Sequence, residues 1–498
     1  MSRREKTQAQ VRRFKEFWGQ YRRNKLGMIG LGLIILFSMM AIGAPFITPY
    51  DPLKSTNLAG SKAAPIWMTA FPGYEQASRN MDPINDPSLS TKEAFSKWQV
   101  SSTSPAASVV YAGDVGNPED VKQGSIAFQF SRPAGTSYGN VVEQAVFSFT
   151  STYDAPQRFT LDLYYRAEVS ENAIAKIFAV IQNSNGTEYI IWDKRLQDTA
   201  EEWQKPSPRI DSWSPQVRLR LTQDILGSAE RKIFSSPGTY SLILRVTISD
   251  NDASSDATVR LYVDDVNLRG YGAVFGYLGT DQFGADLFSQ LIYGARLSLI
   301  IGILASLLSV VIGTVLGLAA GYLGGATDEV LMRFNDMLLV LPGLPLLLVL
   351  IAVLGPSIWN LVILIGVLGF MTIARVIRSQ VLSYKERTFI EAARAAGAGS
   401  RRIMFKHLLP NVMSLAFAQL ALSVPAAIVT EAALSWLGLG DPTVPTWGRM
   451  LYLAHYYGVL KEWWWIVFPG LCIAFVSIAF IFVGYAMDEV LNPKLRRR

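Results

Sequence analysis

The sequence is poor in cysteine, histidine and charge. Its single cysteine, Cys472, lies in an apolar run, which excludes an intrachain disulfide and suits a buried small hydrophobic residue. Charged residues make up only 17% of the chain, whereas a soluble globular protein carries about 25%. Long windows without Asp, Glu, Lys or Arg alternate with one long polar stretch. Much of the chain is therefore expected to face lipid rather than water.

The sequence also lacks the residues of several kinds of catalytic site. It has no Gly-x-x-x-x-Gly-Lys-Ser/Thr segment, the loop whose backbone N–H groups cradle nucleotide phosphates, so we expect no ATP hydrolysis by this chain. The polar stretch contains neither histidine nor cysteine, which excludes imidazole or thiolate metal sites and His-based triads within it. Paired carboxylates remain open as a catalytic device there.

Basic residues are concentrated at the N-terminus. The 46 Lys and Arg exceed the 40 Asp and Glu by six, and a basic balance can indicate nucleic acid or anionic lipid as a partner. Because an apolar run follows directly, the positive-inside rule favours a cytoplasmic segment over 1–27, with membrane lipid and no nucleic acid as partner. The run has no convincing cleavage site beyond it, so 28–52 is interpreted as a retained first transmembrane helix. The basic residues are Arg3, Arg4, Lys6, Arg12, Arg13, Lys15, Arg22, Arg23 and Lys25.

Six apolar segments are long enough to cross a membrane as helices. A bilayer core about 30 Å thick needs about 20 helical residues, because only internally hydrogen-bonded backbone crosses hydrocarbon. The basic stretch 375–406 and the basic tail 494–498 fall on the same side as the N-terminus, so both termini are expected in the cytoplasm. The long segment between the first two spans is then outside. The six segments are 28–47, 297–323, 337–354, 358–374, 412–430 and 465–487.

That outer insertion, 53–275, has a different pattern from the spans. Apolar and polar residues alternate over 159–165, 240–248 and 259–263, which is typical of strands with one buried face. Several such strands separated by turns predict an antiparallel β-sandwich that is large enough to bury its own core. The stretch 81–104 is expected to be irregular loop.

Two features of the insertion leave alternatives open. Clustered aspartates can ligate calcium, although they more often form turns and solvated strand ends. Tryptophans can form a sugar-stacking platform, although they more often fill a core. The aspartates are Asp250, Asp252, Asp264 and Asp265, and the tryptophans are Trp67, Trp98, Trp192, Trp203 and Trp213.

A spaced motif lies between two predicted spans on the cytoplasmic side. Good helix formers over 387–396 predict a short helix, which Gly397 can end with a left-handed residue. The spacing resembles the EAA loop of ABC importer permeases, in which this helix docks on an ATP-hydrolysing subunit and transmits its motion. His407, where the generic pattern has isoleucine, is similar to the peptide-importer members. The matching residues are Glu391, Ala392, Ala393, Gly397, His407, Leu409 and Pro410.

Further segments resemble the second, C-type permease of the dipeptide, oligopeptide and nickel importers. The resemblance implies a type I ABC importer permease fold with six transmembrane helices, five of them within 276–498, in the cell (inner, cytoplasmic) membrane. It implies no catalytic residue, cofactor or metal. The partners it implies are a second permease subunit, two cytoplasmic ATP-binding subunits and an extracytoplasmic substrate-binding protein. The matching segments are 23–27, 44–52, 278–284, 293–296, 431–440 and 447–448.

The resemblance leaves the substrate and the insertion open. Permeases of this kind resemble importers of peptides, oligosaccharides or nickel complexes. Ordinary members join the first two helices by a short segment, and the insertion instead resembles a carbohydrate-binding-module jelly roll at 73–75, 114–130 and 263–266. The alternative function is therefore a membrane-anchored glycan-binding or glycan-processing protein acting through the outer β-domain. Six spans and an EAA-like loop are more than an anchor needs.

Small and ionisable residues within the spans admit two interpretations each. Gly313, Gly317 and Gly321 recur every four residues, which favours close helix packing over a gating movement. Glu431 lies at the end of an apolar helix, where an ionisable group is costly unless it is paired or wet. It could line the substrate path or hold the outer loop.

Overall fold

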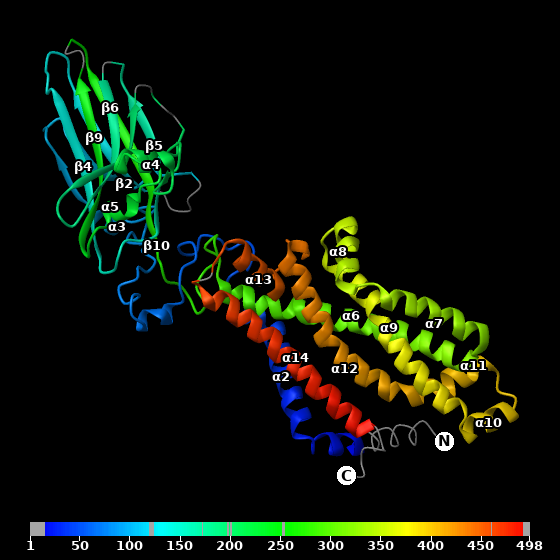
Figure 1. The fold of residues 1–498 in the computed structure, drawn as a ribbon. Helices are drawn as coiled ribbons and strands as arrows, with labels where there is room; N and C mark the ends of the chain where they lie inside the picture. The colour runs from blue at the N-terminus through cyan, green and yellow to red at the C-terminus, as the bar shows by residue number, and fades with distance from the viewer. Residues whose placement is uncertain are drawn as a thin grey trace. The chain divides into compact units, whose positions relative to one another are not determined.

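The chain divides into two compact units, which we call the helical unit and the β unit. The helical unit comprises Met1–Ser55 with Leu287–Arg498, and the β unit comprises Thr56–Asp286 (Figure 1). The computed structural model describes residues 15–118, 124–171, 173–196, 199, 202–250, 254–459 and 461–491.

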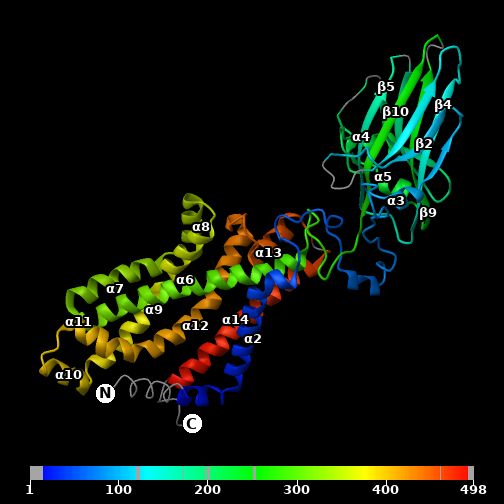
Figure 2. The same ribbon diagram turned by 180° about the vertical axis from the view of Figure 1, so that it is seen from behind.

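The helical unit consists of long apolar helices joined by short helices and turns (Figures 1 and 2). Its helices are α2 Lys25–Ile47, α6 Leu287–Leu323, α7 Gly325–Val340, α8 Gly343–Leu354, α9 Ile358–Lys385, α10 Thr388–Ala395, α11 Ser400–Arg402, α12 Leu409–Leu434, α13 Trp447–Tyr456 and α14 Trp463–Leu491, with the π-helical turns η2 Ile403–Leu408 and η3 Ser435–Leu439 around α12. Within the described residues, five helical segments are long and apolar enough to cross a membrane, built on α2, α6, α9, α12 and α14.

The segment predicted as a single span over 337–354 is broken in the structure. Helices α7 and α8 meet at an angle of 88°, and together they would make the sixth span. Pro342 causes the break, because proline lacks an N–H donor and disfavours helical backbone in the residue before it. Leu341 accordingly has an extended conformation, with φ −70° and ψ 134°. The number of spans is therefore five, or six if the bent pair is counted as one.

Glycines on one face of α6 allow it to pack closely against α9. A Cβ atom on Gly313 would come within 2.8 Å of the Ile373 Cβ, and one on Gly321 within 2.9 Å of the Val381 Cβ. Between them, a Cβ on Gly317 would lie 2.5 Å from a backbone carbonyl oxygen of α9. These distances confirm that the glycine repeat serves close helix packing.

The β unit is a sandwich of two five-stranded antiparallel sheets, as the alternating pattern predicts. One sheet has the order β1-β4-β9-β6-β7 and the other β2-β3-β10-β5-β8 (Figures 1 and 2). Inward-facing apolar side chains of both sheets form a single core between them. The strands are β1 Gln99–Ser102, β2 Ala107–Ala112, β3 Ser125–Arg132, β4 Asn140–Ser151, β5 Arg158–Val169, β6 Ala173–Gln182, β7 Glu188–Leu196, β8 Ile210–Asp211, β9 Gly238–Asp250 and β10 Ala257–Tyr271.

The stretch 81–104 is more ordered than the expectation of an irregular loop. It contains the short helix α3 (Lys92–Ser96), whose N-cap Thr91 accepts a hydrogen bond from the Ala94 N–H, and the edge strand β1. Only four residues of β1 pair with β4, and all four are exposed. An exposed strand leaves little apolar alternation in the sequence, which explains why the pattern did not predict it.

The tryptophans of the β unit divide between core and surface, with Trp203 half-buried. Trp98 and Trp192 are buried in the sandwich core, whereas Trp67 and Trp213 are more than one-third exposed. Trp67 and Trp213 lie in separate segments, each with its indole N–H bonded to a backbone carbonyl oxygen, of Tyr277 and Gln157 respectively.

Two of the four aspartates hold a neighbouring loop. Asp264 is buried and accepts a hydrogen bond from the Asn117 N–H at 2.7 Å, and Asp265 accepts one from the Asn117 side chain at 2.8 Å. Asp252 and the side chain of Asp250 lie outside the described residues. Within the described part of the chain, no three His, Cys, Asp or Glu residues are grouped so as to hold a metal ion.

Candidate functional site

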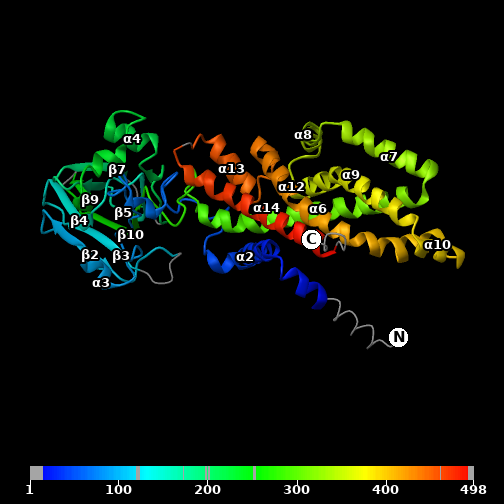
Figure 3. The same ribbon diagram turned by 60° about the horizontal axis from the view of Figure 1, so that its bottom comes forward.

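The predicted motif residues lie together at one end of the helical unit (Figure 3). Helix α10 packs on η2, which joins α11 to α12. The predicted residues are placed as follows: Glu391, Ala392 and Ala393 in α10, Gly397 just after its end, His407 in η2, and Leu409 and Pro410 at the start of α12.

Helix α10 has one buried face and one exposed face. Ile390 is fully buried in a hydrophobic cluster with Ile403 and Leu408 of η2 and with side chains of α6, α9 and α12. Glu391 and Ala392 are exposed on the other face. The buried face therefore ties α10 to three long helices, while Glu391 and Ala392 on the other face are exposed.

Gly397 ends α10 in the predicted left-handed conformation, with φ +75°. The Gly397 N–H donates to the Arg394 carbonyl oxygen at 2.9 Å, and the Ala398 N–H donates to the Ala393 carbonyl oxygen at 3.0 Å. These two bonds form a Schellman motif, which satisfies carbonyl groups that would otherwise be orphaned at the helix end. The left-handed conformation predicted for Gly397 is confirmed.

A tyrosine at the end of α6 connects α10 to the long helices. The Arg394 guanidinium lies 5.5 Å from the centroid of the Tyr322 ring, and the Lys385 ammonium of α9 lies 5.9 Å from it. Such cation–π contacts are each worth about 0.5–1 kcal/mol at exposed sites. Together with Ile390, they make α10 part of the helical framework rather than a loose loop.

Substituting alanine for Gly397 is expected to fray the end of α10. A left-handed conformation costs an ordinary residue roughly 1–2 kcal/mol, and no atom lies within 4 Å of the new Cβ, so the backbone alone bears this cost. Hydrogen exchange over 388–398 should speed up about 5- to 30-fold, the factor that this energy represents. Gly399→Ala is the matched control, because Gly399 has φ −68° and equally open surroundings. Equal exchange rates in the two variants would refute the assignment of Gly397 as a left-handed cap.

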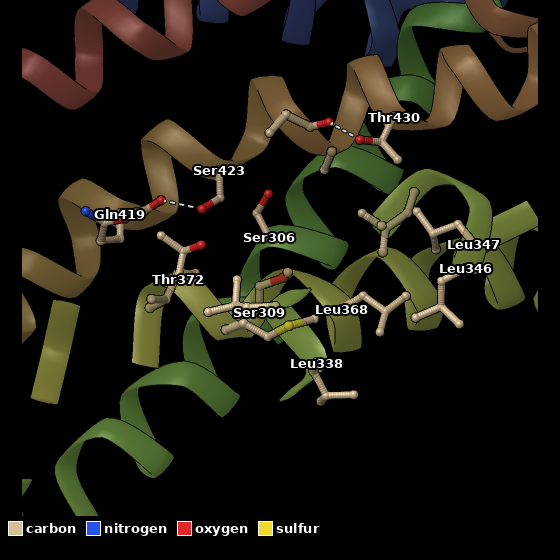
Figure 4. Close-up of a pocket in the computed structure, with 18 of the residues that line it drawn as sticks. Ser306, Ser309, Leu338, Leu346, Leu347, Leu368, Thr372, Gln419, Ser423 and Thr430 are labelled. Carbon is tan, nitrogen blue, oxygen red and sulfur yellow. Dashed lines mark hydrogen bonds between the residues drawn. The ribbon is translucent and has the colours of Figure 1, made fainter. Parts of the chain in front are cut away.

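A cavity of about 460 Å³ lies between α6, α7, α8, α9 and α12 (Figure 4). Gln419, Ser423 and Thr430 line it from α12, and Ser306 and Ser309 line it from α6. Leucines of α7, α8 and α9 supply much of the apolar lining. These leucines are Leu338, Leu339, Leu346, Leu347 and Leu368.

The polar groups of the cavity are all uncharged. The hydroxyls of Ser423 and Thr430 donate to carbonyl oxygens four residues earlier in α12, at 2.7 Å each, and the Ser309 hydroxyl donates to the Gly366 carbonyl oxygen at 2.8 Å. The Ser306 hydroxyl is buried and has no hydrogen-bond partner within the described structure. The cavity therefore offers hydroxyl and amide groups, but no ionised group, to a molecule inside it.

Glu431 does not line this cavity and instead forms hydrogen bonds that hold the segment after α12. It is buried, and its Oε1 accepts hydrogen bonds from the Ser435 hydroxyl at 2.8 Å and the Thr446 hydroxyl at 2.9 Å. Thr446 also caps α13, because its Oγ1 accepts from the Arg449 N–H. The fully buried Trp447 then donates from its indole to the Leu291 carbonyl oxygen of α6 at 3.0 Å. Of the two interpretations of Glu431, the structure supports the one in which it holds the loop between α12 and α13.

Removing the Glu431 carboxylate is expected to loosen α13. In Glu431→Ala the buried hydroxyls of Ser435 and Thr446 lose their acceptor, which costs about 1–3 kcal/mol for each group left unsatisfied. Glu431→Gln keeps an acceptor oxygen and should perturb α13 much less. Hydrogen exchange over 447–456 checks this. An alanine variant that exchanges as slowly as the glutamine variant would show that the Glu431 hydrogen bonds do not hold α13.

The cavity residues were not predicted from the sequence. Ser306, Ser309, Gln419 and Ser423 are ordinary small or amide residues within apolar spans, and they converge only through the packing of separate helices. Their one sequence signal is a polar residue inside a span, and Thr314 gives the same signal without lining the cavity. By contrast, the EAA-like residues are local in sequence and were found together.

Comparison with known families matches most of the chain outside the β unit. Residues 313–497 match the family described as binding-protein-dependent transport system inner membrane component. Residues 12–65 match the N-terminal TM domain of oligopeptide transport permease C. The two matched ranges thus lie on either side of most of the β unit.

The β unit has only a slight similarity to a solved structure. The C-terminal family 22 carbohydrate binding module of Clostridium thermocellum Xyn10B aligns with 38% of this chain and 94% of its own length, at 12% identity and a TM-score of 0.21. This likeness is too slight to assign the β unit a role.

Named relatives agree with the family matches. The di/tripeptide transport system permease protein DppC of Pseudomonas aeruginosa is 41% identical over 220 residues, 44% of this chain and 72% of the relative. The dipeptide permease DppC of Bacillus subtilis is 38% identical over 56% of this chain and 88% of its own length. The oligopeptide permease OppC of the same organism is 37% identical over 44% of this chain and 72% of its own length. The chain therefore belongs to the family of binding-protein-dependent transport system inner membrane components, among its dipeptide and oligopeptide permeases.

Proposed function

We propose that this chain is one of two permease subunits of an ATP-driven importer of peptides, and that separate cytoplasmic ATPase subunits drive it through α10. The observation that supports the proposal is that α10 has one buried face and one exposed face. Its exposed face, with Glu391 and Ala392, is available to an ATPase, and its buried Ile390 lies in a cluster shared with α6, α9 and α12. A displacement of α10 would therefore move the helices that surround the cavity.

Aromatic side chains beside this exposed face also suit a protein partner. Phe389 is 40% exposed and Phe405 is 55% exposed, on α10 and η2 respectively. Exposed aromatic residues are typical anchors of protein interfaces, where they fill pockets on the partner. In the proposed complex these rings and Ala392 contact a cleft on the ATPase subunit.

We propose that the cavity is this chain's part of the translocation path. The second permease would form the rest of the wall around it. Its hydroxyl and amide groups can exchange hydrogen bonds with peptide groups, which are themselves neutral donors and acceptors. The lining contains no carboxylate, histidine or cysteine, so it offers none of the usual ligands for a bare metal ion. We favour peptides over oligosaccharides or nickel complexes on the names of the relatives.

The proposed orientation follows the basic residues. The N-terminal segment, the loop around α10 and the C-terminal tail lie in the cytoplasm, and the insertion over 53–275 lies outside, where a substrate-binding protein delivers its cargo. The α10 loop carries Arg387, Arg394, Arg401, Arg402 and Lys406.

Affinity purification from native membranes tests the docking role of α10. Ala392→Trp places a bulky group on the exposed face and is expected to lose the ATPase subunits while it retains the second permease. Gly19→Trp is the matched control, because Gly19 is exposed and, among the described residues, no neighbouring atom lies within 4 Å of a new Cβ. Retention of the ATPases by Ala392→Trp, or purification of the wild-type chain alone, would overturn the proposal.

A further inference from the structure

Three hydroxyl groups that line the cavity donate their only proton to a helix carbonyl. The hydroxyls of Ser423 and Thr430 donate to carbonyl oxygens four residues earlier in α12, at 2.7 Å each (Figure 4). The Ser309 hydroxyl of α6 donates to the Gly366 carbonyl oxygen of α9 at 2.8 Å. Because a hydroxyl group has one proton and two lone pairs, each of these oxygens can only accept a hydrogen bond from a molecule in the cavity.

The other polar groups of the lining do not reverse this excess of acceptors. The Gln419 amide supplies both an acceptor and a donor, and the hydroxyls of Ser306 and Thr372 can act as either. The described residues that line the cavity include no Lys, Arg or His. A carboxylate in the cavity would therefore meet few donors and no positive charge, whereas a group rich in N–H donors would meet several acceptors.

The ammonium group is the end of a peptide that suits this lining. It carries three N–H donors and no acceptor, whereas the carboxylate at the other end carries only acceptors. We propose that the cavity binds the amino-terminal end of a peptide in transit, and that the carboxylate end faces the second permease. This inference rests on the proposed function, since it takes a peptide as the substrate and the cavity as part of its path.

The acceptors of α12 lie in a stripe along one side of the helix. Gln419, Ser423 and Thr430 are separated by four and then seven residues, close to one and two helical turns. At 1.5 Å per residue the stripe is about 16 Å long, the length of about four or five extended peptide residues. An ammonium group can therefore pass from one acceptor to the next. Neutral acceptors hold it less tightly than a carboxylate would, which suits passage through the cavity rather than retention in it.

Photo-cross-linking in the assembled importer tests which end of the peptide enters the cavity. Two tripeptides carry a diazirine side chain, one at the first residue and one at the third. Both keep free termini, so the substrate-binding protein meets the same charged ends. Proteoliposomes with this chain, the second permease, the ATPases and the binding protein are illuminated during ATP-driven uptake. Mass spectrometry then locates the labelled residues.

The first-residue probe is expected to label 419–430 of this chain about ten-fold more than the third-residue probe does. This factor is what a hydrogen bond to a charged group is roughly worth. The third-residue probe should instead label the second permease. Equal labelling of 419–430 by the two probes, or stronger labelling by the third-residue probe, overturns the inference. No labelling of 419–430 by either probe while uptake proceeds also overturns it.

A variant without two of the acceptors tests the role of the hydroxyls. Ser423→Ala with Thr430→Val should lower first-residue labelling of 419–430 about ten-fold, and Ser423→Ala alone should lower it less. Ser414→Ala is the matched control, because the Ser414 hydroxyl bonds to a carbonyl oxygen of the same helix at 3.4 Å but lies outside the cavity lining. Unchanged labelling in both α12 variants would overturn the inference. Failure of the wild-type assembly to take up either tripeptide would instead contradict the proposed function, and the inference with it.

Discussion

Replacing Gly317 with leucine is expected to destabilise the chain severely and to abolish transport. A Cβ at this position would lie 2.5 Å from the Ala374 carbonyl oxygen and 2.9 Å from the Ile377 Cβ, so a larger side chain must force α6 and α9 apart. Overpacking a tight site costs about 1–3 kcal/mol and occasionally more. We expect Gly317→Leu at the upper end of this range, because rigid backbone is among the atoms it would displace.

The measurement is the thermal unfolding midpoint of the full-length chain in detergent, together with uptake by the assembled importer. Gly470→Leu in α14 is the matched control, since within the described part of the chain no neighbouring atom would lie within 4 Å of a Cβ there. It should keep a midpoint close to that of the wild type. If Gly317→Leu were as stable as Gly470→Leu, the close packing of α6 on α9 would be wrong.

The stability of the β unit is expected to fall as the pH rises towards 8, chiefly because of the buried carboxyl group of Glu143. Glu143 of β4 is fully buried on the inward face of its sheet, next to Val141 and Ala145 in the core pattern. Neither carboxyl oxygen has a hydrogen-bond partner within the described structure. Burial raises the pKa of Glu143 from 4.5 to about 8. The backbone groups of Gln129 and Ser108 lower this pKa, but by less than burial raises it.

The sign of the effect follows from proton binding. Between pH 4.5 and about 8 the folded β unit keeps the Glu143 proton, whereas the unfolded chain has lost it. Stability is therefore full below pH 4.5 and falls by at most about 1.4 kcal/mol per pH unit through this window. Glu143→Gln, which carries no titratable proton, should remove the share of this slope that Glu143 contributes, while Glu230, whose pKa is also raised by burial, keeps its smaller share.

Urea unfolding of the full-length chain at pH 5, 6, 7 and 8 checks the prediction, with tryptophan fluorescence as the probe. Glu143→Met should also be more stable than the wild type at pH 8, because it replaces an unpaired buried polar group with an apolar one of similar length. A wild-type slope equal to that of Glu143→Gln would show that Glu143 is solvated or paired in solution.

Local sequence patterns predicted the parts of the molecule that depend on neighbouring residues. The period-two alternation predicted the sandwich, because the residues of each strand alone show which of its faces is buried. The left-handed cap at Gly397 was predicted because helix formers precede a glycine within one short segment. The apolar runs located the spans for a similar reason, since the bilayer core fixes their length.

Local sequence patterns did not predict the features that depend on residues far apart in the chain. Hydropathy averages over a window and does not register Pro342, so the bend between α7 and α8 was missed. Helix α9 continues past the apolar run to Lys385, helped by Arg378, which bonds to Asp328 of α7 at 2.5 Å and 2.7 Å. The sequence does not predict that Glu143 is buried, because a single glutamate in a strand does not show which face of the sheet it occupies.

The most direct test of the account is ATP-dependent uptake of a radiolabelled dipeptide into proteoliposomes. The vesicles contain this chain, its second permease and the ATPase subunits, with the substrate-binding protein outside. We predict uptake that requires ATP and this chain, that is lost in Ala392→Trp, and that persists in Gly19→Trp. Uptake that continues without this chain, or at full rate in Ala392→Trp, would contradict the claim that α10 couples ATP hydrolysis to peptide import.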